Sequence, residues 1–260
     1  MKLKDILRKT LPFLTKRKLR RYKIYLKTIF HGSNLNKLAQ IYECDKWGIH
    51  FYTQHYMTHF KNFRLKKVKL LEIGVGGYEY ADCGGQSLRM WKRYFSFGKI
   101  YSIDIYDKSP IQEHRIQIFK GSQTDEIFLK SVFEKIGCPD IIIDDGSHVN
   151  EHVIETFKIL FPSLKENGIY AIEDIQTSYW PEYGGDNEKY SVTIMNFFKD
   201  LSDGLNHKEF LLPDYKPDYY DLNIVSIHFY HNMIFIHKGK NDEKSNSVHQ
   251  GKFFKINQQK

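Results

Sequence analysis

From Val68 onward the chain alternates short apolar runs with segments of helical periodicity. Such alternation is typical of βα units, in which each strand is followed by a helix that packs on a mostly parallel sheet. The runs with the length and composition of strands are 69–73, 99–103, 116–119, 140–143 and 168–172. The helical patterns between them lie at about 86–94, 124–136 and 149–165.

Two later apolar runs, 224–230 and 233–237, are separated by His231 and Asn232. They predict an antiparallel hairpin that closes one edge of the sheet. Five parallel strands followed by such a hairpin is the class I methyltransferase form of the Rossmann-like α/β sheet. The sequence therefore predicts an α/β fold that is parallel except at its carboxyl end.

The net charge of +8 is concentrated at the two ends of the chain. Residues 1–30 carry +10 and residues 238–260 carry +4, which leaves −6 on the residues between them. We therefore expect a basic amphipathic arm (1–34), the sheet domain (35–240) and a basic polar tail (241–260).

The mildly acidic middle of the chain argues against a nucleic-acid partner, because such an enzyme carries basic residues across its catalytic face. In the arm, Leu, Ile, Phe and Tyr alternate with Lys and Arg. This pattern fits a helix that lies on an anionic membrane or an acidic partner, and equally a solvated helix packed on its own domain. The sequence leaves these alternatives, and the formation of a homo-oligomer, open.

Cys44, Cys83 and Cys138 are scattered and form no Cys-x-x-Cys pair. This spacing argues against a disulfide framework or a thiolate zinc site and favours a reducing compartment. No apolar run approaches the ~20 residues of a membrane span, and the amino end does not read as a secretory signal. We expect a cytoplasmic protein, with the inner face of the membrane as a further location if the arm binds lipid.

A glycine-rich turn, Leu71-Glu72-Ile73-Gly74-Val75-Gly76-Gly77, ends the first expected strand. Glycines at this edge let the backbone approach a nucleotide-like ligand closely. Glu72 suits the cationic amino-acid group of S-adenosylmethionine and would repel a pyrophosphate. The third glycine of the dinucleotide register is also missing, so an NAD-dependent enzyme is disfavoured. We assign Glu72, Gly74 and Gly76 to the cofactor.

Asp104 ends the second expected strand, where its carboxylate can accept hydrogen bonds from ribose hydroxyls. The alternative is a turn or a helix cap, which is common for aspartate after a strand. After the third strand, Gln123 lies in the segment Gly121–Asp125, which can either contact the adenine or cap the next helix.

The segment Asp144-Asp145-Gly146-Ser147-His148 follows one expected strand, and Glu173-Asp174 follows the next. The carboxyl ends of adjacent parallel strands meet at one edge of a sheet, so these side chains can converge. Asp145, Glu173 and Asp174 would offer three hard oxygen ligands, which suit Mg²⁺ or a similar cation. The simpler interpretation is that these carboxylates cap a helix or face solvent.

His148 can act beside such a cation as a general base near neutral pH. An alcohol is a poor nucleophile until its proton is removed, and a nearby metal ion lowers its pKa. His148 also opens the pattern His-x-x-Glu-His of inverzincin peptidases, but an apolar strand followed by Asp-Asp-Gly-Ser is the wrong setting for that zinc helix.

With these motifs the chain resembles the macrolide-sugar O-methyltransferases of the mycinamicin and tylosin type and their relatives in bacterial polysaccharide gene clusters. The residues that carry the resemblance are Asp45-Lys46-Trp47-Gly48, His50, Tyr52, Leu71–Gly77, Gly84-Gly85-Gln86-Ser87-Leu88, Met90-Trp91, Asp104, Asp107-Lys108, Gly121-Ser122-Gln123, Asp144–His148, Glu173-Asp174 and Ser178-Tyr179-Trp180. The similarity extends from about residue 40 to residue 240.

The resemblance implies a magnesium-dependent enzyme in which Asp145, Glu173 and Asp174 bind the metal and His148 is the base. It adds Ser87 and Asp144 to the cofactor residues. It also implies that the segments 45–52 and 178–185 shape the site. Trp47, Tyr179 and Trp180 would otherwise be expected in the core, and the alternative is that their rings lie on a sugar.

The function that we expect is transfer of a methyl group from S-adenosylmethionine to a sugar hydroxyl. The acceptor would be a nucleotide sugar, a capsular or other bacterial glycan, or a glycosylated metabolite. One alternative is an O-methyltransferase of the same fold that acts on a non-sugar hydroxyl. Another is a non-catalytic, membrane-associated subunit of a glycan-assembly complex.

Overall fold

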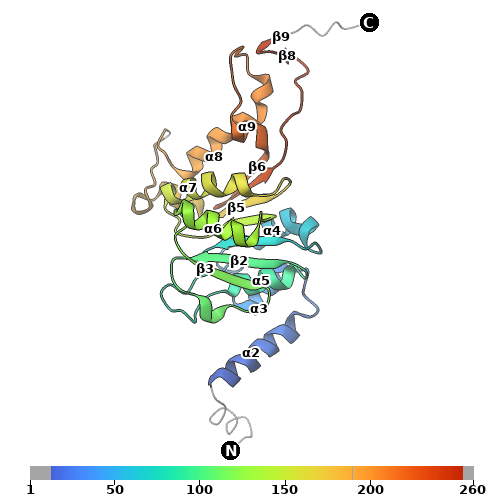
Figure 1. Ribbon diagram of the computed structural model, residues 1–260, viewed down its shortest axis with the longest axis vertical. Helices are drawn as coiled ribbons and strands as arrows, with labels where there is room; N and C mark the ends of the chain where they lie inside the picture. Colours follow the sequence, from blue (N-terminus) through green and yellow to red (C-terminus); the bar gives the residue numbers. More distant parts are fainter. Residues whose placement is uncertain (1–12, 189, 254–260) are drawn as a thin grey trace, which may run out of the picture. The chain divides into compact units, whose positions relative to one another are not determined.

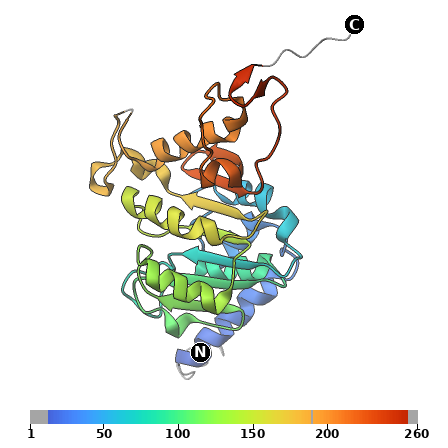
Figure 2. The same cartoon turned by 45° about the horizontal axis from the view of Figure 1, so that its top comes forward.

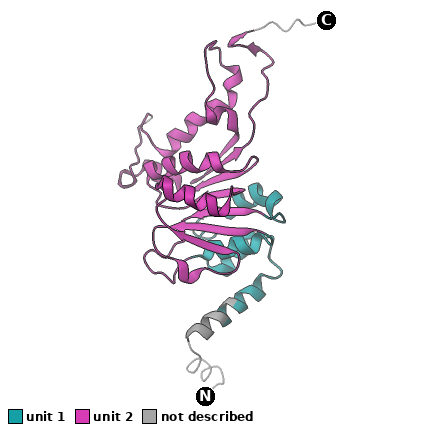
Figure 3. Ribbon diagram, in the orientation of Figure 1, with its two compact units in different colours: residues 1–67, 85–97 teal, residues 68–84, 98–260 magenta. Residues whose placement is uncertain are grey.

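The computed structural model describes residues 13–188 and 190–253. The chain forms two compact units, which Figure 3 shows in different colours. Unit 1 comprises residues 1–67 and 85–97, and unit 2 comprises residues 68–84 and 98–260. These divisions follow contacts rather than the charge pattern, and they differ from the boundaries that the sequence suggested.

Unit 2 is built on a seven-stranded sheet with the order β3-β2-β1-β4-β5-β7-β6 (Figure 1). The strands are β1 (Lys69–Ile73), β2 (Lys99–Asp104), β3 (Ile116–Lys120), β4 (Ile141–Asp144), β5 (Ile169–Glu173), β6 (Ile224–Tyr230) and β7 (Met233–Lys238). The first five are parallel, and β7 is antiparallel to both β5 and β6. The predicted fold class, including the hairpin, is therefore confirmed.

Helices α6 (Glu126–Ile136), α7 (Asn150–Leu160) and α8 (Ile194–Asp203) pack over one face of this sheet (Figures 1 and 2). Alternate strand residues enter the same apolar core, because side chains along a strand point to opposite faces in turn. Phe157 of α7 shows how tightly the layers pack, since its ring centroid lies 5.1 Å from that of Tyr170 and 4.9 Å from that of Phe198.

The opposite face of the sheet carries two buried carboxylates. Glu72 of β1 is in register with Ile143 of β4, which is in register with Ala171 of β5. Glu173 lies two residues beyond Ala171 and therefore on the same face as Glu72. Their side chains are 0% and 3% exposed, respectively. The pleat of the sheet thus directs both carboxylates away from the α6–α7 core.

Unit 1 is helical and comprises α2 (Phe13–Thr28), α3 (Leu35–Tyr42), α4 (Thr53–Phe60), the 3-10 turn η1 (Lys61–Phe63) and α5 (Gln86–Tyr94). Its core is aromatic: the Trp91 ring lies 4.8 Å from Tyr56 and 6.0 Å from Phe60, and all three side chains are fully buried. Helix α5 has the predicted bounds, although its contacts place it in unit 1.

The remaining elements of unit 2 are short. They are the 3-10 turns η2 (Ser109–Ile111), η3 (Phe161–Ser163), η4 (Ile175–Tyr179), η5 (Pro181–Tyr183) and η6 (Gly204–Glu209), helix α9 (Tyr219–Asn223), and the hairpin β8 (Val248–His249) with β9 (Lys252–Phe253). The last hairpin lies in the segment expected to be a polar tail. None of the helices among the described residues is long and apolar enough to cross a membrane.

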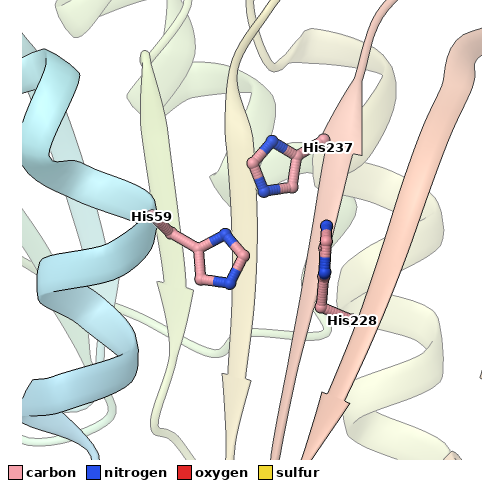
Figure 4. Close-up of side chains that lie close together, drawn as sticks. All are labelled: His59, His228 and His237. Carbon is pink, nitrogen blue, oxygen red and sulfur yellow. The ribbon is translucent and has the colours of Figure 1, made fainter.

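Two histidines project from the neighbouring strands β6 and β7 (Figure 4). The ring centroids of His228 and His237 are 5.2 Å apart. Burial, together with the nearby His228, lowers the pKa of His237 from its ordinary value of 6.5 to about 4. The folded protein therefore holds His237 in its neutral form at pH values where the unfolded chain protonates it.

We expect this difference to make the free energy of unfolding fall as the pH drops from 6.5 towards 4, because the unfolded state then binds the extra proton. For a fully buried group the shift would correspond to roughly 3 kcal/mol, and partial exposure reduces the expected loss to about 1–2 kcal/mol. Urea unfolding across this range should show a shallower pH dependence for His237→Phe than for the wild type. The control is His231→Asn, which changes an exposed histidine in the turn of the same hairpin. An unchanged slope in His237→Phe would contradict the assignment.

Candidate functional site

The glycine turn after β1 lies against the turn that follows β4. The Gly74 amide donates to the Ile103 carbonyl at 2.9 Å, and the Asp145 amide donates to the Ile73 carbonyl at 3.1 Å. Gly74 has a φ of 91°, and a Cβ at this position would collide with the Asp145 carbonyl oxygen. Gly74 is therefore required both by its backbone conformation and by the close approach of the two loops.

Gly76 provides a matched comparison. Its φ is 73°, but a Cβ there would meet no heavy atom of the described residues within 4 Å. We expect Gly76→Ala to destabilise the protein by about 1 kcal/mol, the cost of left-handed backbone alone. Gly74→Ala adds a backbone collision and should cost ~3 kcal/mol or more. Urea unfolding of both variants tests this ranking, and equal losses would contradict it.

Asp104 binds the glycine turn from the end of β2. One of its carboxylate oxygens accepts from the Val75 amide at 3.0 Å, and the other accepts from the Tyr106 amide at 2.8 Å. Asp104 therefore has the turn-stabilising role that the sequence offered as an alternative to ribose binding. Each carboxylate oxygen can accept a second hydrogen bond, so contact with a ribose hydroxyl is still chemically available.

Lys108 holds the loop that follows the glycine turn. Its side chain is 1% exposed, and its Nζ donates to the carbonyl oxygens of Tyr80 at 2.9 Å and Cys83 at 3.4 Å. Lys108 was among the residues that carry the family resemblance, but its spacing predicted no role for it, because a buried lysine cannot be distinguished from a surface lysine by its neighbours in sequence. It positions residues 77–84 beside the site.

Gln123 and Asp144 form a buried network behind the Asp144–His148 loop. The Gln123 amide nitrogen donates to Asp144 Oδ1 at 3.4 Å and to Thr156 Oγ1 at 3.0 Å, while its Oε1 accepts from the Ser147 amide at 2.8 Å. Tyr170 donates to Asp144 Oδ2 at 3.5 Å. These contacts give both residues a role in holding the loop, and their contact with a cofactor stays a prediction.

Burial has a direct electrostatic effect on this network. Asp144 is 1% exposed, and burial raises the pKa of its carboxyl group to about 7. The neighbouring Asp145 also raises this pKa, whereas hydrogen bonds from Gly146, Gln123 and Tyr170 lower it.

Asp145 lies close to each of the other two acids expected to bind metal, but no single group of the described residues holds Asp145, Glu173 and Asp174 together. Carboxylate oxygens of Glu72, Asp145 and Glu173 lie within 4.8 Å of one another. Side-chain ligand atoms of Asp145, His148 and Asp174 do so as well. Asp145 belongs to both groups and therefore joins the ends of β1, β4 and β5. The sequence had placed Glu72 only at the cofactor, and the structure adds it to the carboxylate cluster.

His148 lies between two of these acids. Its Nε2 is 3.9 Å from Asp145 Oδ1 and 3.7 Å from Asp174 Oδ2. The side chains of His148, Asp145 and Asp174 are 24%, 27% and 18% exposed, so a ligand can reach them. Both His148 and Asp174 have left-handed backbone, with φ of 58° and 55°. Such conformations are unfavourable for residues with a Cβ and are often retained at functional sites.

The donor set fits a hard divalent cation. It consists of carboxylate oxygens, with Glu72 and Glu173 almost fully buried. Close carboxylates repel one another in a low-dielectric setting, and a bound cation relieves this repulsion. Carboxylates without thiolates favour Mg²⁺ or Mn²⁺ over softer metals. The residues expected from the sequence therefore suit the metal.

Asn150 was not singled out from the sequence, yet it connects three segments next to the site. It is 1% exposed, and its Nδ2 donates to the carbonyl oxygens of Thr177 at 3.0 Å and Tyr183 at 2.9 Å. Its Oδ1 accepts from the Ile194 amide at 2.7 Å. A polar residue at the buried start of an apolar helix is the signal that could have identified it.

The aromatic residues after β5 are not in the core. Tyr179 and Trp180 are 45% and 48% exposed, which corrects the expectation from sequence alone that they are buried. The Trp180 ring lies 5.9 Å from that of Tyr183. Trp47 is half-buried and contacts Phe51 edge to face in unit 1. Ser87 is the second residue of α5, also in unit 1.

Comparison with known proteins gives close relatives, although no protein-family model matches the chain. It is 46% identical over 214 residues to mycinamicin VI 2''-O-methyltransferase of Micromonospora griseorubida, covering 81% of this chain and 54% of that protein. It is also 46% identical over 216 residues to demethylmacrocin O-methyltransferase of Streptomyces fradiae, with the same coverage of both. This chain thus spans about half the length of these curated relatives.

A solved structure extends the likeness to three dimensions. The MycE methyltransferase from the mycinamycin biosynthetic pathway, in complex with Mg, SAH and mycinamycin VI, matches with a TM-score of 0.78 and 45% identity. The match covers 81% of this chain and 55% of that one. Over the residues that these comparisons cover, the chain is therefore homologous to the macrolide-sugar O-methyltransferases, the family that its motifs predicted.

Proposed function

We propose that this chain transfers a methyl group from S-adenosylmethionine to a sugar hydroxyl, with Mg²⁺ or a similar cation. The observation that carries the proposal is the meeting of Asp145, His148 and Asp174 directly after β4 and β5. This cluster lies at the same edge of the sheet as the glycine turn, where open α/β folds bind their ligands. The relatives named above support the reaction class.

His148 is the proposed proton acceptor. S-adenosylmethionine supplies an electrophilic methyl group, and a divalent cation lowers the pKa of a nearby hydroxyl. The acceptor oxygen forms the new bond to carbon, the electron pair of the broken carbon–sulfur bond stays on sulfur, and the proton passes to His148. Carboxylate oxygens of Asp145 and Asp174, 3.9 and 3.7 Å from Nε2, position the imidazole.

The cofactor residues are proposed as Glu72, Gly74, Gly76, Ser87, Asp104, Gln123 and Asp144. The open space above Gly76 allows a ligand to approach the backbone closely. Asp104 retains lone pairs for ribose hydroxyls in addition to its two backbone hydrogen bonds. Asp145, Glu173 and Asp174 are the proposed metal ligands, and Glu72 lies close enough to Asp145 and Glu173 to join them.

The acceptor that we propose is the sugar of a small glycosylated molecule, a nucleotide sugar or a bacterial glycan. Tyr179 and Trp180 follow Asp174 closely and present exposed rings. Aromatic faces bind the apolar face of a sugar while its hydroxyls remain free to reach polar groups. Two adjacent hydroxyls near the carboxylate cluster would also fix which oxygen attacks.

The experiment is methyl transfer by the full chain from labelled S-adenosylmethionine to glycosylated metabolites, nucleotide sugars and simple phenols, with and without EDTA. We expect transfer to sugar hydroxyls that stops when EDTA is in excess and returns with Mg²⁺. Full activity in excess EDTA would contradict the proposed role of a divalent cation. Transfer to phenols alone would show that the acceptor is a non-sugar hydroxyl. Failure to bind S-adenosylmethionine in calorimetry would overturn the proposed activity and favour a non-catalytic subunit.

A further inference from the structure

Helix α2 is fixed to the rest of unit 1 at its carboxyl end. Arg93 of α5 donates through Nε and Nη2 to the Thr28 carbonyl, at 3.2 and 3.0 Å, and its guanidinium lies 5.3 Å from the centre of the Tyr25 ring. Arg20 also donates to both carboxylate oxygens of Glu43, at 3.0 and 2.8 Å. The described part of α2 is therefore an attached helix with a defined inner face, on which Thr28 is fully buried.

The outer face of α2 and the two residues that follow the helix carry a row of exposed apolar side chains, which we call the α2 stripe. Its members are Leu19, Tyr22, Leu26, Ile29 and Phe30, with exposed fractions of 45%, 59%, 44%, 44% and 90%. Steps of three and four residues place the helical members on one side of the helix. A row of large exposed apolar groups on an attached helix marks a binding surface rather than scattered surface residues.

Charge accompanies this row. Lys23 and Lys27 are exposed and fall beside the α2 stripe by helical spacing. Residues 1–30 contain eleven lysines and arginines and a single acidic residue, Asp5. An apolar strip bordered by lysines is the composition of helices that lie in the plane of a membrane, with the apolar side chains among acyl chains and the cations at lipid phosphates.

We propose that α2 docks this protein on an anionic phospholipid bilayer through the α2 stripe. The density of positive charge selects an acidic surface, and the row of Leu, Tyr, Ile and Phe requires an apolar phase beneath it. A nucleic acid would pair with the positive charges but would not bury the apolar side chains of the α2 stripe. A second copy of this basic helix would bring like charges together. This interaction is independent of the proposed methyl transfer.

Co-sedimentation of the full chain with phosphatidylcholine vesicles, with and without phosphatidylserine, tests the proposal. We expect binding to the vesicles that contain phosphatidylserine, weakened by high salt, and little binding to phosphatidylcholine alone. The double variant Leu26→Glu/Phe30→Glu should lower vesicle affinity at least tenfold. The double variant Lys23→Gln/Lys27→Gln should lower it roughly fivefold for each lysine removed.

The matched control is the double variant Leu65→Glu/Phe97→Glu, which adds the same two negative charges at another exposed leucine and phenylalanine of unit 1, 62% and 60% exposed in the structure. It should bind vesicles like the wild type, and circular dichroism should show that all variants are folded. Vesicle binding unaffected by Leu26→Glu/Phe30→Glu would overturn the proposal. A second result would also overturn it: a dimer of the wild type, seen without lipid in analytical ultracentrifugation, that Leu26→Glu/Phe30→Glu dissociates. The α2 stripe would then be a contact between two copies of the chain.

Discussion

Replacing His148 by glutamine is expected to lower kcat for methyl transfer by about 10²–10⁴-fold, the usual contribution of a positioned general base. Glutamine keeps a polar side chain between Asp145 and Asp174 but cannot take up the proton of the acceptor hydroxyl. Affinities for S-adenosylmethionine and for Mn²⁺ should stay near those of the wild type. Steady-state kinetics, calorimetry and metal-binding titrations would separate the lost proton transfer from lost binding.

His152 provides the matched control for this experiment. It lies on α7 four residues beyond His148, and its Nδ1 forms a 3.0 Å hydrogen bond with Ser147 Oγ. Because the proposed reaction gives His152 no proton to carry, His152→Gln should retain most of the wild-type kcat. A His148→Gln enzyme with near-wild-type turnover, or an equal loss in both variants, would remove the base assignment.

The second large effect is expected at Asp145, which is shared by both groups of possible ligands. Asp145→Asn should weaken Mn²⁺ binding by at least about 100-fold, since changes to residues that only support ligands already cost 10–100-fold. Methyl transfer should fall with it, because the acceptor hydroxyl is then no longer activated. Electron paramagnetic resonance of free Mn²⁺ measures the affinity without relying on turnover.

Glu182→Gln is the control for the loss of one acidic charge near this segment, because Glu182 is exposed on η5. It should bind Mn²⁺ like the wild type. Thermal unfolding adds a second measurement, since a cation that binds only the folded state raises Tm, and above Kd the rise grows with the logarithm of the cation concentration. Wild-type protein should show this rise and Asp145→Asn should not. A preserved rise in Asp145→Asn would place the metal elsewhere.

Much of the sheet could be predicted because buried parallel strands appear in sequence as nearly continuous apolar runs. The bounds of β1 and α5 were predicted without error, and the other four parallel strands were predicted to within one residue at each end. The meeting of Asp145 with Glu173 and Asp174 followed from topology, since parallel strands bring their carboxyl ends to one edge. Most residues of the candidate site could therefore be predicted once the order and direction of the strands were predicted.

The parts that could not be predicted depend on contacts between residues distant in sequence. The grouping of α5 with α4 follows from the aromatic contacts of Trp91, and its grouping with α3 follows from direct packing of the two helices. No local pattern in the sequence reveals either contact. Glu72 was assigned to the cofactor because it precedes glycines, but the pleat also directs it to the face that carries Glu173. Gln123 resembled a loop residue, whereas its amide is used to hold the Ser147 amide.

The left-handed backbone at Asp174 lowers the stability of the fold at a residue that we propose as a metal ligand. Glycine adopts a φ of 55° without penalty. The free energy of unfolding of Asp174→Gly should therefore exceed that of Asp174→Ala by about 1 kcal/mol, as measured by urea unfolding. Both variants lack the carboxylate and should be inactive, so the difference between them reports the backbone alone. Selection for stability alone would therefore favour glycine at this position, whereas the proposed role in metal binding requires the carboxylate.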